Sequence, residues 1–402
     1  MNKQKKKLPL AMQIFIALIL AIVVGLLMQS QSGFAENYIK PFGTIFLNLL
    51  KFIVVPIVLF SIMCGIISMR DIKKVGAIGL KTVVYYMCTT AFAITIGLVG
   101  GNIFQRFFPV IATTDLAYEM KERTSVMDTI VNIFPSNFIS PMVESNMLQV
   151  IVIALLLGFS IVKACNSINE IFMKCMEMIL KLSPIGVFCL LCPVVASNGA
   201  AIIGSLAMVL LAAYICYIIH AVVVYSIAVK TMGGVSPAKF FKEMLPAIMF
   251  AFSSASSVGT LPINMECVEK LGAKKEVSSF VLPLGATINM DGTAIYQGVC
   301  AIFIASCYGI HLTLPQMMTI ILTATLASIG TAGVPGSGMV MLAMVLTSVG
   351  LPVDGIALVA GVDRIFDMGR TTVNITGDAS CCIIVSNLEQ KKELRRAKKA
   401  QE

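Results

Sequence analysis

Ionisable side chains recur at helical spacing between residues 363 and 378, near the C-terminal end of the chain. If this stretch is stepped as a helix at ~100° per residue, its polar positions fall within an arc of roughly 80°. These positions are Asp363, Asp367, Arg370, Asn374 and Asp378. A charge at the centre of a bilayer costs ~3 kcal/mol on insertion scales. The spacing therefore predicts a stripe that faces a partner, a ligand or water, which makes it a candidate binding site.

A second stretch, residues 289–293 (NMDGT), echoes residues 374–378 (NITGD), because an amide, a polar residue and a glycine recur at the same spacing. Carboxylate and amide oxygens without a nearby His or Cys favour Na⁺ or another hard cation over a transition metal. Arg370 carries a planar fork that suits a carboxylate, and Asp367, one turn earlier, suits an ammonium. These residue types predict a cation-coupled carrier for an acidic amino acid. The alternative is that the charges pair only with one another and hold helices together.

The composition places these residues in a membrane protein. Hydrophobic residues make up 57% of the 402 residues and charged residues only 13%, whereas a soluble domain is about 25% charged. The net charge of +9 comes from basic residues that flank apolar segments and fill both tails, which indicates membrane orientation and no nucleic-acid partner. Most of the 12 cysteines lie in apolar runs, including the CxxC of Cys189 and Cys192, and are interpreted as packing residues.

Long apolar runs before residue 230 are predicted to be transmembrane helices. The second run contains Pro56, where a kink is expected, and Pro184 and Pro193 interrupt the fifth. The loop of residues 105–146 is assigned to the outside, and both termini are assigned to the cytoplasm. The predicted spans cover residues 8–28, 45–69, 82–104, 148–164, 171–196 and 200–229.

Two later apolar segments are interrupted by small residues. Residues 247–265 break at SSASSVGTLP (253–262) and have basic flanks on both sides, which predicts a re-entrant hairpin that enters from the cytoplasm. Residues 317–349 break at SIGTAGVPGSG (328–338) and are predicted to form a second hairpin, entering from the outside.

A span at residues 281–308, which holds NMDGT, follows the first hairpin, and the polar helix of residues 363–378 follows the second. The chain is therefore predicted to be all-α, with eight transmembrane helices and two re-entrant helical hairpins. Hairpins of opposite entry form an inverted repeat, which in transporters indicates a binding site near the bilayer midplane. Helix N-termini at the hairpin tips present free N–H groups to an anion.

These motifs resemble those of the dicarboxylate/amino acid:cation symporters, a family that includes the excitatory glutamate transporters and archaeal aspartate-transporting homologues. The resemblance covers nearly the whole chain, and its motifs occur in family order: SSASSVGTLP, GATINMDGT, SIGTAGVPG and DMGRTTVNITGD. The DMGR form of the last motif is similar to that of prokaryotic members. The resemblance implies secondary active symport of glutamate or aspartate by an elevator mechanism, in a homotrimer embedded in the lipid of a prokaryotic plasma or inner membrane.

The resemblance also divides the chain into a fixed scaffold and a moving transport domain. It assigns residues 1–74 to scaffold helices one and two, 75–105 to helix three of the transport domain, 106–199 to an extracellular loop with scaffold helices four and five, 200–388 to the remainder of the transport domain, and 389–402 to a basic cytoplasmic tail.

Substrate-binding residues follow from the resemblance position by position. Asp367 matches the carboxylate that holds the substrate amino group, and Arg370 matches the arginine that holds its side-chain carboxylate. The implied substrate shell is Ser256, Ser257, Thr293, Val334, Gly338, Asp367, Arg370, Thr371 and Asn374, with Val334 and Gly338 acting through their backbone.

The resemblance also implies three sodium positions. The first matches Gly285, Asn289, Asn374 and Asp378. The second matches Thr287, Ser328, Ile329 and Thr331. The third matches Tyr86, Thr89, Thr90, Asn289 and Asp291. Because oxygen-bearing residues fill every side-chain position, Na⁺ is the expected coupling ion.

Proton coupling is the alternative within the same mechanism, and a C4-dicarboxylate or cystine is the alternative substrate. An ion or anion channel is the rival class of function. No enzymatic activity is expected, because the serines of residues 253–257 lack a matching general base.

One departure concerns a second arginine that family members usually carry near the site. The corresponding positions hold Ala255 and Met368, and Arg364, one turn before Met368, is expected to take its place. The alternative is that Arg364 pairs with Asp363 or points to the aqueous edge. His220 and His311 are isolated in the sequence, which favours a satisfied or interfacial histidine over a proton relay.

Overall fold

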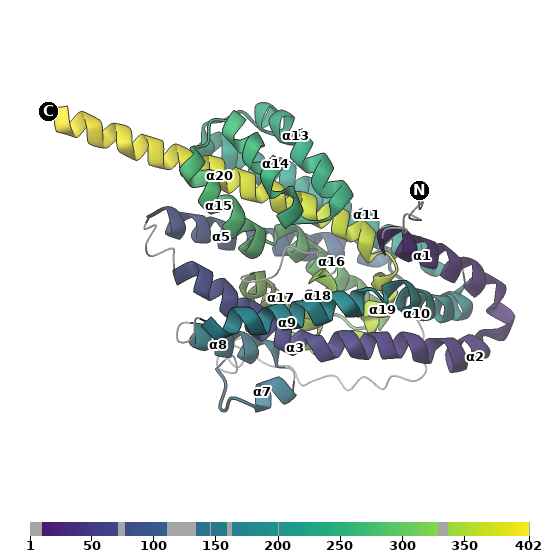
Figure 1. The fold of residues 1–402 in the computed structure, drawn as a ribbon. Helices are drawn as coiled ribbons and strands as arrows, with labels where there is room; N and C mark the ends of the chain where they lie inside the picture. Colours follow the sequence, from purple (N-terminus) through teal and green to yellow (C-terminus); the bar gives the residue numbers. More distant parts are fainter. Residues whose placement is uncertain are drawn as a thin grey trace, which may run out of the picture.

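A computed structural model describes residues 10–70, 77–110, 134–144, 146–158, 163–199, 201–328 and 337–401. Every regular element within these ranges is helical, as the sequence predicts. Figure 1 shows the last helix, α20 (Asp363–Gln401), running through the molecule and extending past the other elements at its C-terminal end.

One group of helices comes mainly from the first half of the chain. α1 (Leu10–Leu27) packs along α10 (Ser183–Asn198), and α3 (Lys40–Arg70) contacts α8 (Met147–Gly158), α9 (Lys163–Leu180) and α10. Short helical segments join α1 to α3: η1 (Gln29–Gln31), α2 (Ser32–Phe34) and η2 (Ala35–Ile39). The close contact of α1 with α10 requires Gly25, because an added Cβ would lie 2.7 Å from Val195 Cβ.

Predicted boundaries in this group need one correction. The fifth predicted span, residues 171–196, is two helices, because α9 ends at Leu180 and α10 begins at Ser183. Pro184 lies in the first turn of α10, where its missing N–H costs no helical hydrogen bond. Pro193 lies inside α10 without ending it, and Pro56 lies inside α3.

The second group holds the predicted motifs. α5 (Ala77–Phe104) is followed by η3 (Gln105–Phe107), whereas the short α7 (Ser140–Val143), later in the chain, contacts α8 of the first group. α11 (Ala201–Ile219) continues without a break through η4 (His220–Tyr225), α12 (Ser226–Ala228) and η5 (Val229–Gly233). The remaining elements are α13 (Pro237–Ser254), α14 (Ser257–Lys270), α15 (Lys275–Ile288), α16 (Asp291–Cys307), α17 (Leu314–Ser328), α18 (Ser337–Ser348), η6 (Val353–Gly355) and α19 (Ile356–Ala360).

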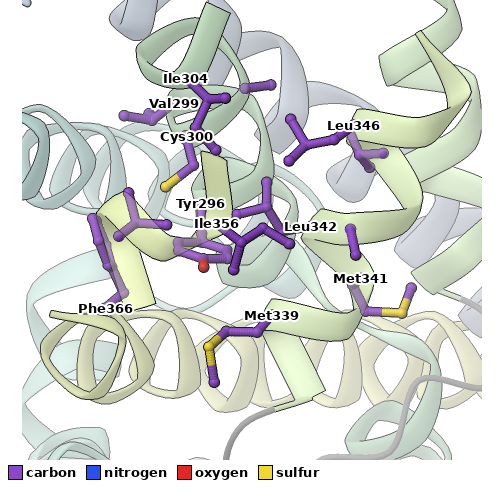
Figure 2. Packing of buried hydrophobic residues seen from close by; sticks show 14 of the residues in the cluster. Tyr296, Val299, Cys300, Ile304, Met339, Met341, Leu342, Leu346, Ile356 and Phe366 are labelled. Atoms are coloured by element: carbon purple, nitrogen blue, oxygen red, sulfur yellow. The ribbon is translucent and has the colours of Figure 1, made fainter. Parts of the chain in front are cut away.

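Helix α16 is the centre of this group, because every one of its residues is buried. It contacts α5, α11, α18 and α20. Figure 2 shows apolar side chains of α16 meeting those of α18, α19 and α20 in one cluster. The labelled residues include Tyr296, Cys300, Ile304, Leu342, Leu346, Ile356 and Phe366. This packing holds α20 against α16, where the polar residues of both helices meet.

The first interrupted segment breaks over a shorter stretch than predicted. Only Ala255 and Ser256 separate α13 from α14, whereas the predicted break spans residues 253–262. Ala255 has φ 51°, a left-handed conformation that costs an L-residue about 1–2 kcal/mol and here ends α13. The Ser256 hydroxyl then accepts a hydrogen bond from Gly259 N at 3.0 Å and starts α14, so Pro262 lies inside a helix. Residues 329–336 of the second interruption lie outside the described residues.

The two echoed motifs, NMDGT and NITGD, differ in backbone conformation. The predicted span of residues 281–308 divides at Asn289 and Met290, between α15 and α16, whereas NITGD lies within the unbroken helix α20. Asn289 is extended (φ −90°, ψ 102°), and its side chain reaches α20 instead of continuing α15. The break therefore turns the Asn289 side chain toward α20 and makes Asp291 the first residue of α16.

Several helices are apolar enough to span a membrane. Within the described residues, 3 helical stretches are long and apolar enough by themselves: Ile78–Phe107, Ile203–Gly233 and Lys275–Cys307. A bent pair, Met12–Leu27 with Gln29–Phe46, passes the same test together, with a 75° bend. The count of eight spans and two re-entrant hairpins stays a prediction.

Candidate substrate and cation site

The stripe predicted on residues 363–378 lies on a single helix, α20, and its five side chains are buried. α20 contacts α5, α11, α13, α14, α15 and α16, so the stripe faces protein on several sides. Two clusters of polar side chains form along it, one around Arg370 and one around Asp378.

The first cluster surrounds the guanidinium of Arg370. Arg370 Nε donates to Asp367 Oδ1 at 2.8 Å, Nη1 donates to Asp363 Oδ1 at 3.0 Å and Nη2 donates to Asp363 Oδ2 at 3.4 Å. The guanidinium carbon also lies 4.8 Å from the centre of the Tyr296 ring, a cation–π contact. Asp363 thus grips Arg370 with both oxygens. Sequence reasoning placed Asp363 on the stripe and named Arg364 as its possible partner, whereas in the structure it pairs with Arg370, two helical turns away.

Arg364 joins this cluster from the neighbouring face of α20. Its Nη1 lies 3.5 Å from Asp367 Oδ2, and its Nη2 donates to the carbonyl of Ser254 at 3.1 Å. Ser254 is the last residue of α13, directly before the break at Ala255. Arg364 therefore connects Asp367 with the tip of the first interrupted segment. Its ion pair is with Asp367 and not with Asp363, the partner considered as an alternative.

The second cluster surrounds two buried carboxylates, Asp291 and Asp378. Thr90 Oγ1 donates to Asp291 Oδ1 at 2.6 Å, and the Tyr225 hydroxyl donates to Asp291 Oδ2 at 2.7 Å. His220 Nε2 lies 3.2 Å from the same Oδ2. His220 is isolated only in the sequence: it is buried and contacts Asp291 through Nε2, as a satisfied core histidine would, while its Nδ1 has no hydrogen-bond partner among the described residues. Local spacing gave no signal for this contact, since 71 residues separate the partners.

Asn289 connects Asp378 to the rest of the second cluster. Its Nδ2 donates to Asp378 Oδ1 at 2.9 Å and to the Asn374 carbonyl at 3.0 Å. Its Oδ1 is buried and has no hydrogen-bond donor among the described residues. A buried acceptor without a donor costs free energy unless a cation or water meets it. The donor set of this cluster therefore fits a hard cation such as Na⁺.

Glycines bring both clusters into close contact. A Cβ on Gly285 would lie 2.4 Å from Asp378 Oδ1 and 2.5 Å from the Tyr86 hydroxyl. A Cβ on Gly338 would lie 2.0 Å from Arg370 Nη1. Side chains larger than hydrogen at either position would displace the polar groups, so each glycine is a packing requirement of one cluster.

Asn374 links the two clusters. It lies one turn after Arg370 and one turn before Asp378, and its Oδ1 accepts from Gly292 N, in the first turn of α16, at 2.7 Å. Arg370 and Asp378 are therefore separated by roughly 12 Å along the helix axis.

The other described residues of the predicted substrate shell and of the third sodium position also lie in the second group of helices. Ser257, Thr293 and Thr371 are buried within the second group of helices, and Ser256 caps α14. Tyr86 donates to the Val281 carbonyl at 3.1 Å, and Thr89 donates to the Tyr86 carbonyl at 3.2 Å.

The second sodium position is described only in part. Thr287 Oγ1 donates to the Leu284 carbonyl at 2.9 Å, and Ser328 Oγ donates to the Thr325 carbonyl at 2.7 Å, so each hydroxyl is engaged within its own helix. Ile329, Thr331 and Val334 lie outside the described residues. Across the described residues, no group of three or more His, Cys, Asp or Glu side chains is arranged to hold a metal ion.

Comparisons with known proteins agree with this arrangement of motifs. Residues 10–388 match the model of the sodium:dicarboxylate symporter family, which consists of membrane transporters and not of enzymes. The chain is 36% identical to the proton/sodium-glutamate symport protein of Bacillus subtilis (95% of this chain, 93% of the relative). It is 34% identical to the proton/glutamate-aspartate symporter of Escherichia coli (97% and 95%) and 31% identical to a C4-dicarboxylate transport protein of Bacillus subtilis (94% and 93%).

Proposed function

The chain belongs to the sodium:dicarboxylate symporter family, and on that premise we propose that it takes up glutamate or aspartate by Na⁺-coupled symport. The observation that carries this proposal is the position of Arg370. A guanidinium that holds two carboxylates in a buried cluster lies two turns from a second cluster with an unpaired acceptor oxygen. One site suits an anionic substrate and the other suits a cation, on the same helix.

Substrate binding would exchange one set of charge pairs for another. The side-chain carboxylate of the amino acid would take the place of an aspartate on the Arg370 fork, and its ammonium would bind Asp367. Asp367 favours an amino group over a plain dicarboxylate, because a second carboxylate there would meet like charge. Ser256, Ser257, Thr293, Thr371, Asn374, and the backbones of Val334 and Gly338 would complete the shell.

Sodium would bind the second cluster as a transported ion. Asp378, Asn289, Asn374 and Gly285 would form one position, and Asp291, Asn289, Thr90, Thr89 and Tyr86 would form another. A third position would use Thr287, Ser328, Ile329 and Thr331. Proton/sodium coupling in the name of the Bacillus subtilis relative supports cation coupling, and the amide and hydroxyl oxygens beside the carboxylates suit a hard cation such as Na⁺.

Movement would follow the division into two groups of helices. Residues 1–74 and 106–199 would form a scaffold within a homotrimer, residues 75–105 and 200–388 would carry the site across the membrane, and residues 389–402 would form a cytoplasmic tail. The tight packing of α16 against α5, α11, α18 and α20 supports movement of the second group as one body.

Uptake into proteoliposomes tests the proposal, with Na⁺, H⁺ and K⁺ gradients imposed one at a time. Accumulation of radiolabelled glutamate or aspartate above the external concentration is expected only with an inward Na⁺ gradient. Accumulation driven by an H⁺ gradient alone would replace Na⁺ with H⁺ as the coupling ion. Flux that never exceeds equilibrium would indicate a channel instead.

A further inference from the structure

The C-terminal end of α20 extends past the site and past the surrounding helices (Figure 1). Its contacts with the body of the protein all come from one face. Asn387 Nδ2 donates to the Met232 carbonyl at 2.6 Å, Gln390 Nε2 donates to the Gly272 carbonyl at 3.3 Å, and Lys81 Nζ lies 2.6 Å from Glu389 Oε1. These contacts fix the rotation of the helix about its own axis.

Both acidic residues of this segment are used in that attachment. Glu389 pairs with Lys81, and Glu393 pairs with Lys274, in the turn between α14 and α15. The Lys274 backbone N–H also donates to Ser386 Oγ at 2.9 Å. The remaining charges of residues 389–401 are all basic: Lys391, Lys392, Arg395, Arg396, Lys398 and Lys399.

The basic positions lie on the face opposite to the attachment. At ~100° per residue, Ser386, Asn387, Glu389, Gln390 and Glu393 fall within roughly 160°, and the six basic positions fall within roughly 160° on the other side. Lys391 and Arg395 are exposed, as is Leu394. The helix thus has one face engaged with the protein and one cationic face, and the two glutamates that border that face, Glu389 and Glu393, are paired with Lys81 and Lys274.

We propose that this cationic face of α20, residues 391–399, binds the anionic lipid headgroups of the membrane that the transporter occupies. Clusters of four to eight basic residues next to a membrane segment are attracted to anionic leaflets. Lys399 lies ~9 Å beyond Glu393 along the helix axis, which is about one Debye length at physiological salt. The segment continues directly from the helix that carries the site, so it lies next to the part of the chain that is expected to lie in the membrane. This surface acts independently of which substrate or ion is carried.

Tryptophan fluorescence of the full chain tests the surface. The sequence contains no tryptophan, so Leu394→Trp gives a single reporter beside the basic positions. The variant is placed in lipid nanodiscs of phosphatidylcholine alone or mixed with phosphatidylglycerol. In the mixed discs, the emission maximum should shift to shorter wavelength and iodide quenching should fall. High salt should reverse both changes, because the Debye length falls to ~3 Å at 1 M.

A matched pair of triple variants identifies the charges responsible. Replacing Lys391, Arg395 and Lys398 by glutamine should lower the ratio of docked to free tail on the order of 100-fold, since each basic residue near an anionic surface contributes about fivefold. Replacing the exposed Lys230, Lys239 and Lys242 by glutamine should leave the shift unchanged. Identical emission in both lipid mixtures, or a shift that survives the tail substitutions, would overturn the proposal. A shift caused by soluble polyglutamate but not by phosphatidylglycerol would overturn it in favour of an acidic protein partner.

Discussion

Two pairs of buried carboxylates differ in their partners: Asp363 and Asp367 on α20, and Asp291 on α16 with Asp378 on α20. Asp363 and Asp367 are held by two arginines, Arg370 and Arg364, so their formal charges cancel within the cluster. Asp291 and Asp378 receive hydrogen bonds from Thr90, Tyr225 and Asn289, and His220 lies beside Asp291. Buried carboxylates with only neutral donors are costly, because neutral groups do not repay the desolvation of a charge.

This difference separates the roles of the clusters. The arginine cluster is already neutral, so an arriving zwitterion must compete with internal ion pairs and gains from shape and hydrogen bonds. The second cluster holds two carboxylates and no arginine or lysine partner among its described contacts, so an arriving cation can pair directly with a carboxylate oxygen. The first three predictions below test whether anion recognition and cation recognition can be damaged separately, and the fourth tests the return of the empty carrier.

The largest effect is expected from Arg370→Cys. Removal of a charged, two-pronged partner from a desolvated site costs about 2–5 kcal/mol, on the order of 30- to 1,000-fold or more in affinity. Binding of glutamate and aspartate to purified protein should fall by that factor, and small neutral amino acids such as serine should become competitors. Arg370→Lys, which keeps the charge without the fork, should restore only part of the affinity. Undiminished acidic amino acid binding would refute the assignment of Arg370.

Asp378→Asn should damage the cation cluster. The substitution removes the charged carboxylate to which Asn289 donates, so the Na⁺ concentration needed for half-maximal uptake should rise. Substrate affinity should fall with it, on the order of 10- to 100-fold at fixed Na⁺, because coupled sites share one free energy. Uptake titrated with Na⁺ at several substrate concentrations measures both. An unchanged Na⁺ dependence in a variant that unfolds at the wild-type temperature would remove Asp378 from the cation site.

Two glycine substitutions give a smaller and more selective comparison. Gly285→Ala forces a Cβ against Asp378 and Tyr86, and Gly338→Ala forces one against Arg370. Overpacking of about 1–2 kcal/mol corresponds to roughly 5- to 30-fold in an equilibrium constant. Gly285→Ala should raise the Na⁺ concentration for half-maximal uptake more than it raises the substrate concentration for half-maximal uptake. Gly338→Ala should do the reverse. Both are measured by the same titration of uptake.

Gly204→Ala, in α11, is the matched control, because nothing lies within 4 Å of the added Cβ. It should leave the half-maximal concentrations of both Na⁺ and substrate unchanged. Equal effects of Gly285→Ala and Gly338→Ala on Na⁺ and substrate would show that the two clusters cannot be separated.

The sequence predicts much of this site because its residues lie at short, regular spacings. The stripe of residues 363–378 is confirmed as one buried helical face, since helical geometry alone determines which positions share a face. The contact of His220 with Asp291 and the ion pairs of Lys81 and Lys274 with the end of α20 depend on tertiary packing, which local spacing does not record.

Helix ends were less predictable for a related reason. The break at Ala255 and Ser256 depends on a hydroxyl cap and one left-handed residue, although SSASSVGTLP offers four serines, a glycine and a proline that suit a longer break. The division of residues 171–196 likewise depends on Pro184 starting a helix rather than interrupting one.

The smallest effect is expected from Arg364→Ala, which concerns the empty carrier. Arg364 holds both Asp367 and the Ser254 carbonyl at the tip of the first interrupted segment, and its side chain is 23% exposed. When substrate has left, the positive charge of Arg364 offsets Asp367, and its hydrogen bond to Ser254 holds the end of α13 against α20. A partly exposed pair and one hydrogen bond contribute about 1 kcal/mol each, so the change should be several-fold.

Exchange and net uptake separate this role from substrate binding. Return of the empty carrier is needed for net uptake but not for exchange of internal for external substrate. Arg364→Ala should therefore slow net uptake several-fold while exchange persists, and Arg364→Lys should recover part of the loss, because lysine retains the charge but not the fork. Equal loss of both activities would place Arg364 in substrate binding, and no loss of either would leave its contacts with Asp367 and Ser254 without a role in the transport cycle.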